Sequence, residues 1–179
     1  MDRNIYQYYV EGDCEQNFLR SYMHAKNQDV LIRPGRIEVL NPVAERISNV
    51  KAMTIKKGTK VVLVFDTDVK NVSILEENVQ TLRRVSGLTN KDILFVLSVK
   101  CFEDELVYSS RKLSNVKGLI DLFKAEGMNA FKSGFSNCKN LVDKLSQVGF
   151  DLRRMWTRVP QKPFDQYENS GRSIKQKPQ

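Results

Sequence analysis

The sequence predicts an α/β fold in which a parallel sheet of about four strands is flanked by helices. Apolar runs of strand length alternate with amphipathic segments of helical spacing, which is typical of a parallel sheet with covering helices. The run Val61–Phe65 is apolar throughout, as expected for a central strand whose two faces are both buried. Three of the runs also end in acidic residues, so carboxylates are expected along one edge of the sheet.

Four segments are predicted to be the strands of this sheet. Three of them are apolar runs of strand length, the first with several tyrosines, and the short segment Arg36–Leu40 contains Ile37, Val39 and Leu40. These segments are Ile5–Val10, Arg36–Leu40, Val61–Phe65 and Ile93–Val99.

Helices are predicted between the strands. The first should begin at Asp13, which forms a capping-box pattern with Gln16, and end near Lys26. The second should begin at Pro42, since proline suits the first helical position, and end before the turn at Lys56-Lys57-Gly58, with Val43, Ile47 and Val50 on its apolar face. The third should begin with the capping box at Ser73 and end at Gly87.

The part of the chain after the last strand is predicted to be a helical extension. Three further helices are expected at Phe102–Tyr108, Lys117–Glu126 and Asn137–Val148. Residues 1–157 are therefore predicted to form a single domain. Residues 158–179 contain prolines, glutamines and basic residues with few apolar groups, and they are predicted to form a basic, extended or mobile tail.

Composition limits the classes of function. The chain has 179 residues, 41% of them hydrophobic, which suits one domain with a real core. Its net charge of +8 favours a polyanionic partner, although charge alone favours nucleic acid only weakly. A positive surface around an acidic pocket is more informative, because it suits a metal site that handles phosphodiesters.

Several other chemistries are poorly supported. The three cysteines form no Cys-x-x-Cys pair, so a zinc ribbon and a disulfide framework are both disfavoured. Free thiols and the lack of a signal-peptide core or a membrane-length apolar run lead us to expect a cytoplasmic protein without membrane contact. The single histidine, His24, disfavours a Ser-His-Asp triad, and no P-loop motif occurs.

Carboxylates follow three of the predicted strands. Glu11 and Glu15 follow the first strand, Asp66 and Asp68 the third, and Glu103 the fourth. The carboxyl ends of parallel strands meet at one edge, where ligands bind in open α/β sheets. Clustered carboxylates repel one another unless a cation lies between them, and oxygen ligands suit Mg²⁺ or Mn²⁺. The sequence therefore predicts a divalent-ion site bounded by these residues.

Some of these residues have a second interpretation. Glu15 is either a metal ligand or a solvated glutamate favoured by the helix dipole, and the role of Glu103 is equally open. Asp104 and Glu105 are expected on a solvated helix face. Lys100 could stabilise a transition-state oxyanion and contact nucleic acid, or could be a solvated lysine.

Two motifs resemble the signature of the Toprim domain family. They are Val10-Glu11-Gly12 with Glu15, and Phe65-Asp66-Thr67-Asp68, and the resemblance covers roughly residues 5–110. The family includes topoisomerases, bacterial-type primases, RNA-maturing nucleases and the OLD and RloB-like nucleases. The resemblance implies that Glu11 is the catalytic glutamate and that Asp66 and Asp68 bind metal and take part in catalysis.

The resemblance is closest to the OLD-type and RloB-like nucleases. Topoisomerase and primase versions usually place a glycine shortly after the second aspartate, and residues 69–72 contain none. The segment Cys101-Phe102-Glu103 is similar to one in RloB-like proteins, which implies that Glu103 completes the acidic site, although Asp104 and Glu105 then depart from the usual pattern. Glu15 matches the second glutamate of the OLD-type pattern.

A basic segment near the C-terminus could contact nucleic acid. Arg153, Arg154 and Arg158 surround Trp156, and arginine with tryptophan suits phosphate contact and base stacking. The alternative is that Met155 and Trp156 pack the last element onto the core, since tryptophans are usually well buried.

The sequence as a whole predicts a nuclease that depends on Mg²⁺ or Mn²⁺ and cleaves phosphodiester bonds of DNA or RNA. The resemblance implies a bacterial role in phage defence or nucleic-acid processing. The alternative is a non-catalytic or partner-dependent Toprim module that binds metal, nucleotide or nucleic acid and relies on an ATPase or another chain. A plain nucleic-acid-binding protein is a third possibility, and the oligomeric state is left open.

Overall fold

The computed structural model describes residues 5–178 and contains a four-stranded parallel sheet. In spatial order its strands are β3 (Gly35–Val39), β1 (Ile5–Val10), β4 (Thr59–Asp66) and β5 (Ile93–Ser98). The predicted α/β fold with a parallel sheet of about four strands is therefore confirmed, and the strand order is consistent with a Toprim-like fold. All four strands run in one direction, so their carboxyl ends lie at one edge, as the carboxylate hypothesis requires.

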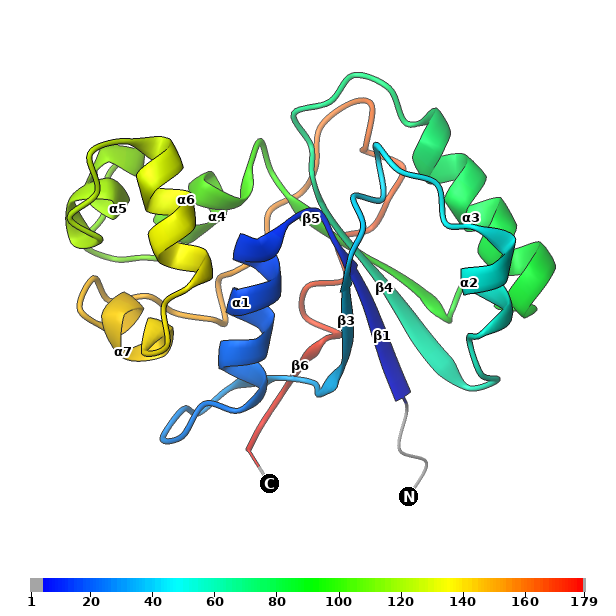
Figure 1. Ribbon diagram of the computed structural model, residues 1–179, viewed down its shortest axis with the longest axis horizontal. Coiled ribbons are helices and arrows are strands. Elements are labelled where there is room, and N and C mark those ends of the chain that lie inside the picture. Colours follow the sequence, from blue (N-terminus) through cyan, green and yellow to red (C-terminus); the bar gives the residue numbers. More distant parts are fainter. Residues whose placement is uncertain (1–4, 179) are drawn as a thin grey trace.

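Helices cover both faces of the sheet (Figure 1). On one face, α1 (Asp13–Met23) packs in a core that includes Phe18, Leu19 and residues of the C-terminal helices. On the other face, α2 (Asn49–Met53) and α3 (Ser73–Ser86) cover a second core built around β4. Alternate residues of β4 belong to the two cores, which explains why the whole strand is apolar.

The C-terminal helices gather beside α1 in Figure 1. They are α4 (Phe102–Tyr108), α5 (Val116–Leu122), α6 (Met128–Ser136) and α7 (Leu141–Ser146). The first has the predicted bounds, whereas α5 and α7 are shorter than predicted. Helix α6 was not predicted from the sequence, although Met128, Phe131 and Phe135 recur at helical spacing and the two phenylalanines are fully buried.

The predicted start of the second helix at Pro42 is wrong, although a helix is present before the turn at Lys56-Lys57-Gly58. Residues 42–44 form a turn, and the short α2 begins only at Asn49, after the cap residue Ser48. The Asn41 side chain accepts a hydrogen bond from the Val43 N–H at 3.0 Å, which stabilises a turn in place of a helix.

Asn78 on α3 stabilises this turn through side-chain hydrogen bonds. Its side chain is buried, accepts from the Ile47 N–H at 2.7 Å, and donates to the carbonyl oxygens of Pro42 and Glu45. A helical hydrogen-bond ladder is thus replaced by tertiary hydrogen bonds to a side chain that lies far away in the sequence.

We expect Asn78→Leu to lower the free energy of unfolding by about 2–4 kcal/mol, because it leaves buried backbone groups unpaired. Gln80→Leu, at an exposed position of the same helix, is the matched control and should change stability by less than about 0.5 kcal/mol. Urea denaturation of the two variants checks this. Equal stabilities would show that Asn78 does not hold the turn.

The segment after Arg158 is packed against the domain, which corrects the prediction of an extended or mobile tail. Phe164 is fully buried against Phe65, with ring centroids 5.6 Å apart, and Ile174 is fully buried in the core beside α1. The chain ends in β6 (Lys175–Gln176), which pairs antiparallel with β2 (Leu31–Ile32). A few well-spaced apolar anchors are enough to fix this polar segment, and average composition does not reveal them.

Two expectations about the chain as a whole can be compared with the structure. Cys14, Cys101 and Cys138 are all free thiols, as predicted. Within the described residues, none of the helices has the length and apolar character needed to cross a membrane.

Candidate metal and nucleic-acid site

The site is positioned by the topology of the sheet. The chain moves from β1 to β3 on one side and later to β4 on the other, so the strand order reverses between β1 and β4. Ligands bind in open α/β sheets at such a switch point, outside the carboxyl ends of the strands. Glu11 directly follows β1, and Asp66 is the last residue of β4.

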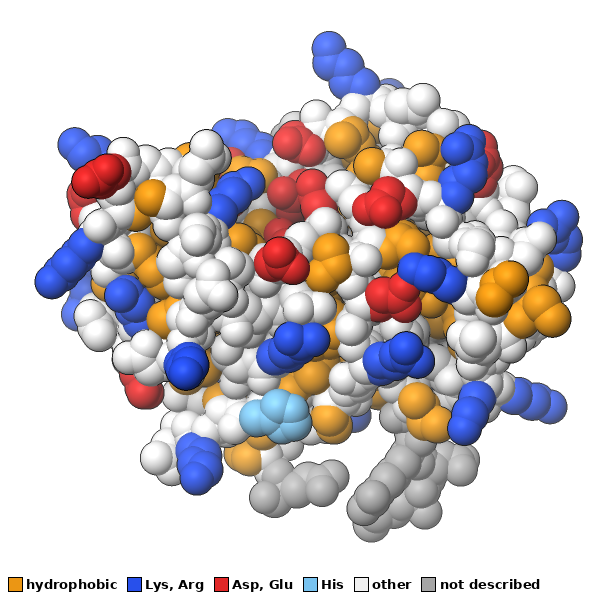
Figure 2. Space-filling view, in the orientation of Figure 1, with side chains coloured by type: hydrophobic (Ala, Val, Ile, Leu, Met, Phe, Trp, Pro, Cys, Tyr) orange, Lys and Arg blue, Asp and Glu red, His pale blue; other side chains and the backbone are white. Residues whose placement is uncertain are grey.

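Five acidic residues line one cavity of about 500 Å³ at this point. Four of them are predicted metal ligands, namely Glu11 after β1, Glu15 on α1, Asp66 on β4 and Glu103 on α4, and the fifth is the exposed Asp13 at the start of α1. Acidic side chains gather at the upper centre of Figure 2, over the ends of β1 and β4, with basic side chains around them. The structure thus brings together four of the five predicted metal ligands.

Asp66 is the most constrained of the four. Its side chain is 8% exposed, and Oδ1 has no hydrogen-bond partner. Burial, followed by the charges of Glu11 and Glu15, raises the pKa of Asp66 to about 9. A buried carboxylate oxygen without a hydrogen-bond partner is unfavourable unless a ligand binds to it. The unpaired oxygen of Asp66 therefore favours a bound cation at this position.

The two glutamates of the first motif lie next to Asp66. Glu11 Oε2 accepts a hydrogen bond from the Asp66 N–H at 3.1 Å, and burial raises the pKa of Glu11. Glu15 is 6% exposed, and burial, with the charges of Glu11 and Glu103, raises its pKa to about 7. The interpretation of Glu15 as a solvated first-turn glutamate is therefore wrong.

Lys132 on α6 supplies a positive charge inside this acidic cavity. Its Nζ lies 3.3 Å from Glu103 Oε1, and Glu103 itself is buried. Sequence reasoning missed Lys132, because α6 was not predicted and nothing in its sequence indicates that it faces the strand ends.

The cavity offers the oxygen donors that a hard divalent cation prefers, but its carboxylates are not yet arranged to bind one. All of its acidic ligands are oxygen donors, and Asp66 Oδ1 is unpaired. Among residues 5–178, however, no three acidic, histidine or cysteine side chains are arranged to hold a metal ion. Glu11 is turned to the Asp66 N–H and Glu103 to Lys132, so rotation of these two side chains is needed for the carboxylates to converge.

Asp68 and Lys100 lie outside the cavity. Asp68 is exposed, yet its charge contributes to the raised pKa of Glu11, so it lies near the site. Lys100 is also exposed, and its backbone adopts a left-handed φ of 72°. Its N–H donates to Thr67 Oγ1 at 3.0 Å, which joins the loop after β5 to the loop after β4.

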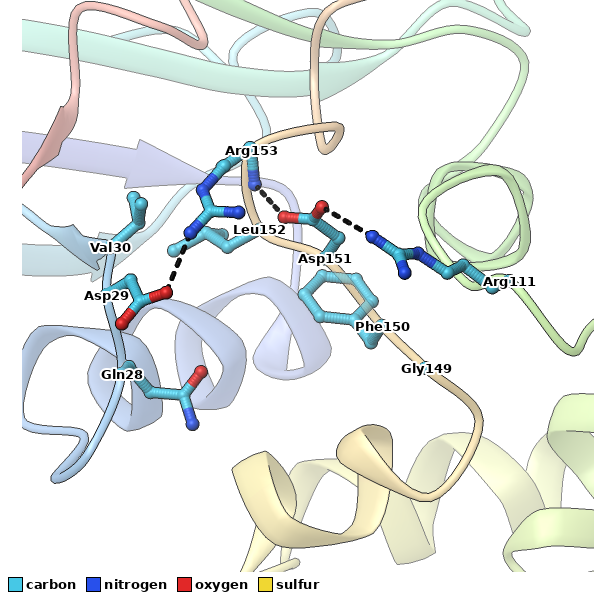
Figure 3. A pocket seen from close by; sticks show the side chains of 9 residues that line it. All are labelled: Gln28, Asp29, Val30, Arg111, Gly149, Phe150, Asp151, Leu152 and Arg153. Carbon is cyan, nitrogen blue, oxygen red and sulfur yellow. Dashed lines mark hydrogen bonds and ion pairs between the residues drawn. The ribbon is translucent and has the colours of Figure 1, made fainter.

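Arg153 occupies a different part of the molecule from the carboxylates. It lines a separate cavity of about 280 Å³, where its guanidinium pairs with Asp29 at 2.8 Å (Figure 3). Asp151 lies between Arg153 and Arg111, accepting from the Arg153 N–H and facing the Arg111 guanidinium. With both arginines opposite carboxylates, this cavity is close to neutral and offers little to a phosphate.

Arg158 is held by the protein itself. It donates to Glu105 at 2.7 Å and to the Val99 carbonyl oxygen at 2.8 Å. Together with Arg154 it lies over the ring of Tyr108, each guanidinium carbon 4.9 Å from the ring centroid. Of the predicted nucleic-acid contacts near Trp156, Arg154 is therefore the one without an ion-pair partner among the described residues.

Glu105 and Trp156 are structural residues. Glu105 is fully buried and accepts from the N–H groups of Val99 and Trp156, which corrects its placement on a solvated helix face. Trp156 is fully buried, and its Nε1 donates to Ser98 Oγ at 3.3 Å. The packing interpretation of the Met155–Trp156 pair is thus confirmed.

Comparison of the chain with protein-family models, with curated proteins and with solved structures finds no match in any of the three. The Toprim resemblance therefore remains a prediction that rests on the two sequence motifs.

Proposed function

We propose that the chain is a nuclease that depends on Mg²⁺ or Mn²⁺ and hydrolyses phosphodiester bonds of DNA or RNA. One observation carries the proposal: carboxylates at the ends of β1 and β4 and on α1 and α4 line one cavity, with a buried unpaired oxygen on Asp66. A cluster of this kind is unfavourable without a cation, and phosphodiester hydrolysis is a common use of carboxylate-held divalent ions.

The residues fall into distinct roles. Asp66, Glu15 and Glu103 would hold the cation, with Asp68 approaching from the neighbouring loop. When bound, the ion would neutralise these carboxylates and act as a Lewis acid toward the phosphate. Glu11 has a raised pKa and faces the cavity, so it suits the acceptance of a proton from the attacking water.

The positive charge of the protein would serve the substrate. The net charge of +8 favours a polyanion, while Lys132 in the cavity is placed to meet a phosphate oxygen. Arg154, beside Tyr108, offers a further contact outside the cavity, and Lys100 at the end of β5 another. The acidic cavity and the basic side chains would contact the sugar–phosphate backbone of the nucleic acid, so neither distinguishes DNA from RNA.

The Toprim resemblance supports the same function. It implies a bacterial role in phage defence or nucleic-acid processing, and with three free thiols it favours a cytoplasmic location.

A partner-dependent Toprim module is the second candidate. It is favoured by the observation that no three of the described acidic side chains yet form a metal site. In this version an ATPase or another protein chain would bring the carboxylates together, and the isolated chain would bind metal, nucleotide or nucleic acid without cleaving it.

Incubation with single- and double-stranded DNA and RNA, in Mg²⁺, Mn²⁺ or chelator, tests the proposal. We expect cleavage of at least one polymer in Mg²⁺ or Mn²⁺ and none in chelator. Glu11→Gln should lower the rate by about 100-fold or more, since it removes the proton acceptor. Glu126→Gln, on the exposed surface after α5, is the matched control and should cleave like the wild type.

The possible outcomes separate the two candidates. Binding of a divalent ion at Asp66 without cleavage of any polymer would favour the partner-dependent module. Cleavage that persists in chelator, or is unchanged in Glu11→Gln, would contradict the proposed site. Truncation of the C-terminal segment is not a suitable test, because Phe164 and Ile174 are part of the two cores.

A further inference from the structure

One edge of the sheet is covered by another segment of the chain, and in the described part of the structure the other edge is open. The outer edge of β5 is covered by the C-terminal segment: the Ser170 N–H donates to the Phe95 carbonyl oxygen at 2.7 Å. The Asn169 side chain accepts from the Leu97 N–H and donates to the Leu97 carbonyl oxygen. The opposite edge strand, β3, pairs only with β1 among the described residues (Figure 1).

The backbone groups that β3 leaves open can be identified. Val39 is paired with Val10, and the Leu40 N–H donates to the Val10 carbonyl oxygen, so Leu40 faces β1. Successive residues of a strand direct their N–H and C=O groups to opposite sides. Gly35, Ile37 and Val39 therefore direct both groups away from the sheet. An open row of this kind is a template for another strand.

The sequence of β3 is complementary to itself in the antiparallel direction. With a two-fold axis through Ile37, Arg36 of one copy lies opposite Glu38 of the other, and Gly35 lies opposite Val39. The outward-facing residues then form the hydrogen-bonded pairs. The Arg36–Glu38 pairs are non-hydrogen-bonded pairs, in which side chains approach most closely.

We propose that β3 pairs antiparallel with β3 of a second copy, which joins two four-stranded sheets into one continuous sheet. Charge complementarity favours a second copy as the partner, because the two-fold symmetry forms two Arg36–Glu38 pairs. Arg36 is exposed and has no ion-pair partner among the described residues, while Glu38 pairs with Lys51 on α2.

The surface beside β3 supports the same contact. Arg36, Glu38 and Val50 line one groove of about 740 Å³ between β3 and α2. Val50 and Met53, three residues apart on α2, are each 73% exposed. Because the two-fold axis is perpendicular to the sheet, the two copies of α2 lie on the same face, where these apolar side chains can be covered.

The pairing is independent of the proposed nuclease function. The two sheets run antiparallel, so their carboxylate cavities lie at opposite ends of the continuous sheet. Neither cavity receives residues from the second copy. Failure of the dimer therefore leaves the function untouched, and failure of the function leaves the dimer untouched.

Sedimentation velocity over a concentration series tests the pairing in the full chain. We expect a monomer–dimer equilibrium in the wild type. Arg36→Glu places glutamates opposite each other, and Glu38→Arg places arginines opposite each other. Each change should weaken the dimer by about tenfold or more, since like charges in facing positions are destabilising.

Mixing the two variants gives the sharpest result. A heterodimer of Arg36→Glu with Glu38→Arg restores both opposite-charge pairs, so the mixture should dimerise more tightly than either variant alone. Asp121→Asn, an exposed change far from β3 in the sequence, should dimerise like the wild type. Circular dichroism of each variant checks that it is folded.

Three outcomes would overturn the proposal. They are a wild type that stays monomeric at all concentrations, a dimer that both charge reversals leave unchanged, and a mixture that dimerises no more tightly than either variant alone. A wild-type monomer that instead binds extended peptides would assign the open edge to a different partner.

Discussion

Asp66→Asn should abolish metal-dependent cleavage and at the same time make the metal-free protein more stable. The pKa of Asp66 is raised to about 9 by burial and by the neighbouring carboxylates. At neutral pH the folded chain therefore holds Asp66 protonated, whereas the unfolded chain leaves it ionised, and this difference costs up to about 4 kcal/mol of folding free energy. Asparagine keeps the shape and cannot ionise in either state, so most of this cost disappears.

The same shift predicts a pH dependence with a definite sign. The ordinary pKa of an aspartate is 3.8, so between about pH 4 and pH 9 the folded chain binds more protons at Asp66 than the unfolded chain. The contribution of this proton to the free energy of unfolding is greatest below about pH 4 and is lost as the pH rises from about 4 to about 9. In chelator, the stability of the wild type should therefore fall more steeply from about pH 5 to pH 8 than that of Asp66→Asn.

Denaturation in chelator and in Mg²⁺ checks both statements. Mg²⁺ should stabilise the wild type and leave Asp66→Asn unchanged, because the variant lacks the central ligand. Asp121→Asn, at an exposed site, should behave like the wild type throughout. If Asp66→Asn is less stable than the wild type in chelator, the Asp66 carboxylate is stabilising as it stands, and the argument for a missing cation fails.

The second large effect concerns Glu105. Replacement by alanine leaves the Arg158 guanidinium without its carboxylate and leaves the N–H groups of Val99 and Trp156 unpaired. We expect the free energy of unfolding to fall by about 3–5 kcal/mol, the usual cost of removing one partner of a buried pair. Urea denaturation of Glu105→Ala measures this directly.

Glu126→Ala, at an exposed position, is the control and should change stability by less than about 0.5 kcal/mol. The double variant Glu105→Ala, Arg158→Ala should recover part of the loss, because it removes the unpaired charge. A Glu105→Ala variant as stable as the control would show that the ion pair and its hydrogen bonds contribute nothing net.

Local patterns in the sequence were sufficient to predict the sheet. The apolar runs that end at Val10, Phe65 and Val99 predict three strands, and the observed strands end within one residue of these positions. Such runs are long because both faces of a central strand are buried. The carboxylate cavity followed from the same information, since parallel strands place their ends at one edge.

Tertiary contacts account for what the sequence did not predict. Asn78 converts a helix-like segment at Pro42 into a turn, and Phe164 fixes a segment whose composition resembles a tail. Lys132 enters the acidic cavity from a helix that was not predicted, and Glu105 is buried in the core, where it pairs with Arg158. In each case the deciding partner lies more than 25 positions away in the sequence.

The most direct test of the account is the position of Mn²⁺ in crystals of the protein, located by anomalous scattering. We expect an ion in the cavity at the ends of β1 and β4, bonded to Asp66 and at least one of Glu15 and Glu103 at about 2.0–2.3 Å. The Glu103 side chain should rotate away from Lys132 to reach it. A cavity that stays empty at saturating Mn²⁺, or an ion bound only elsewhere, would contradict the account.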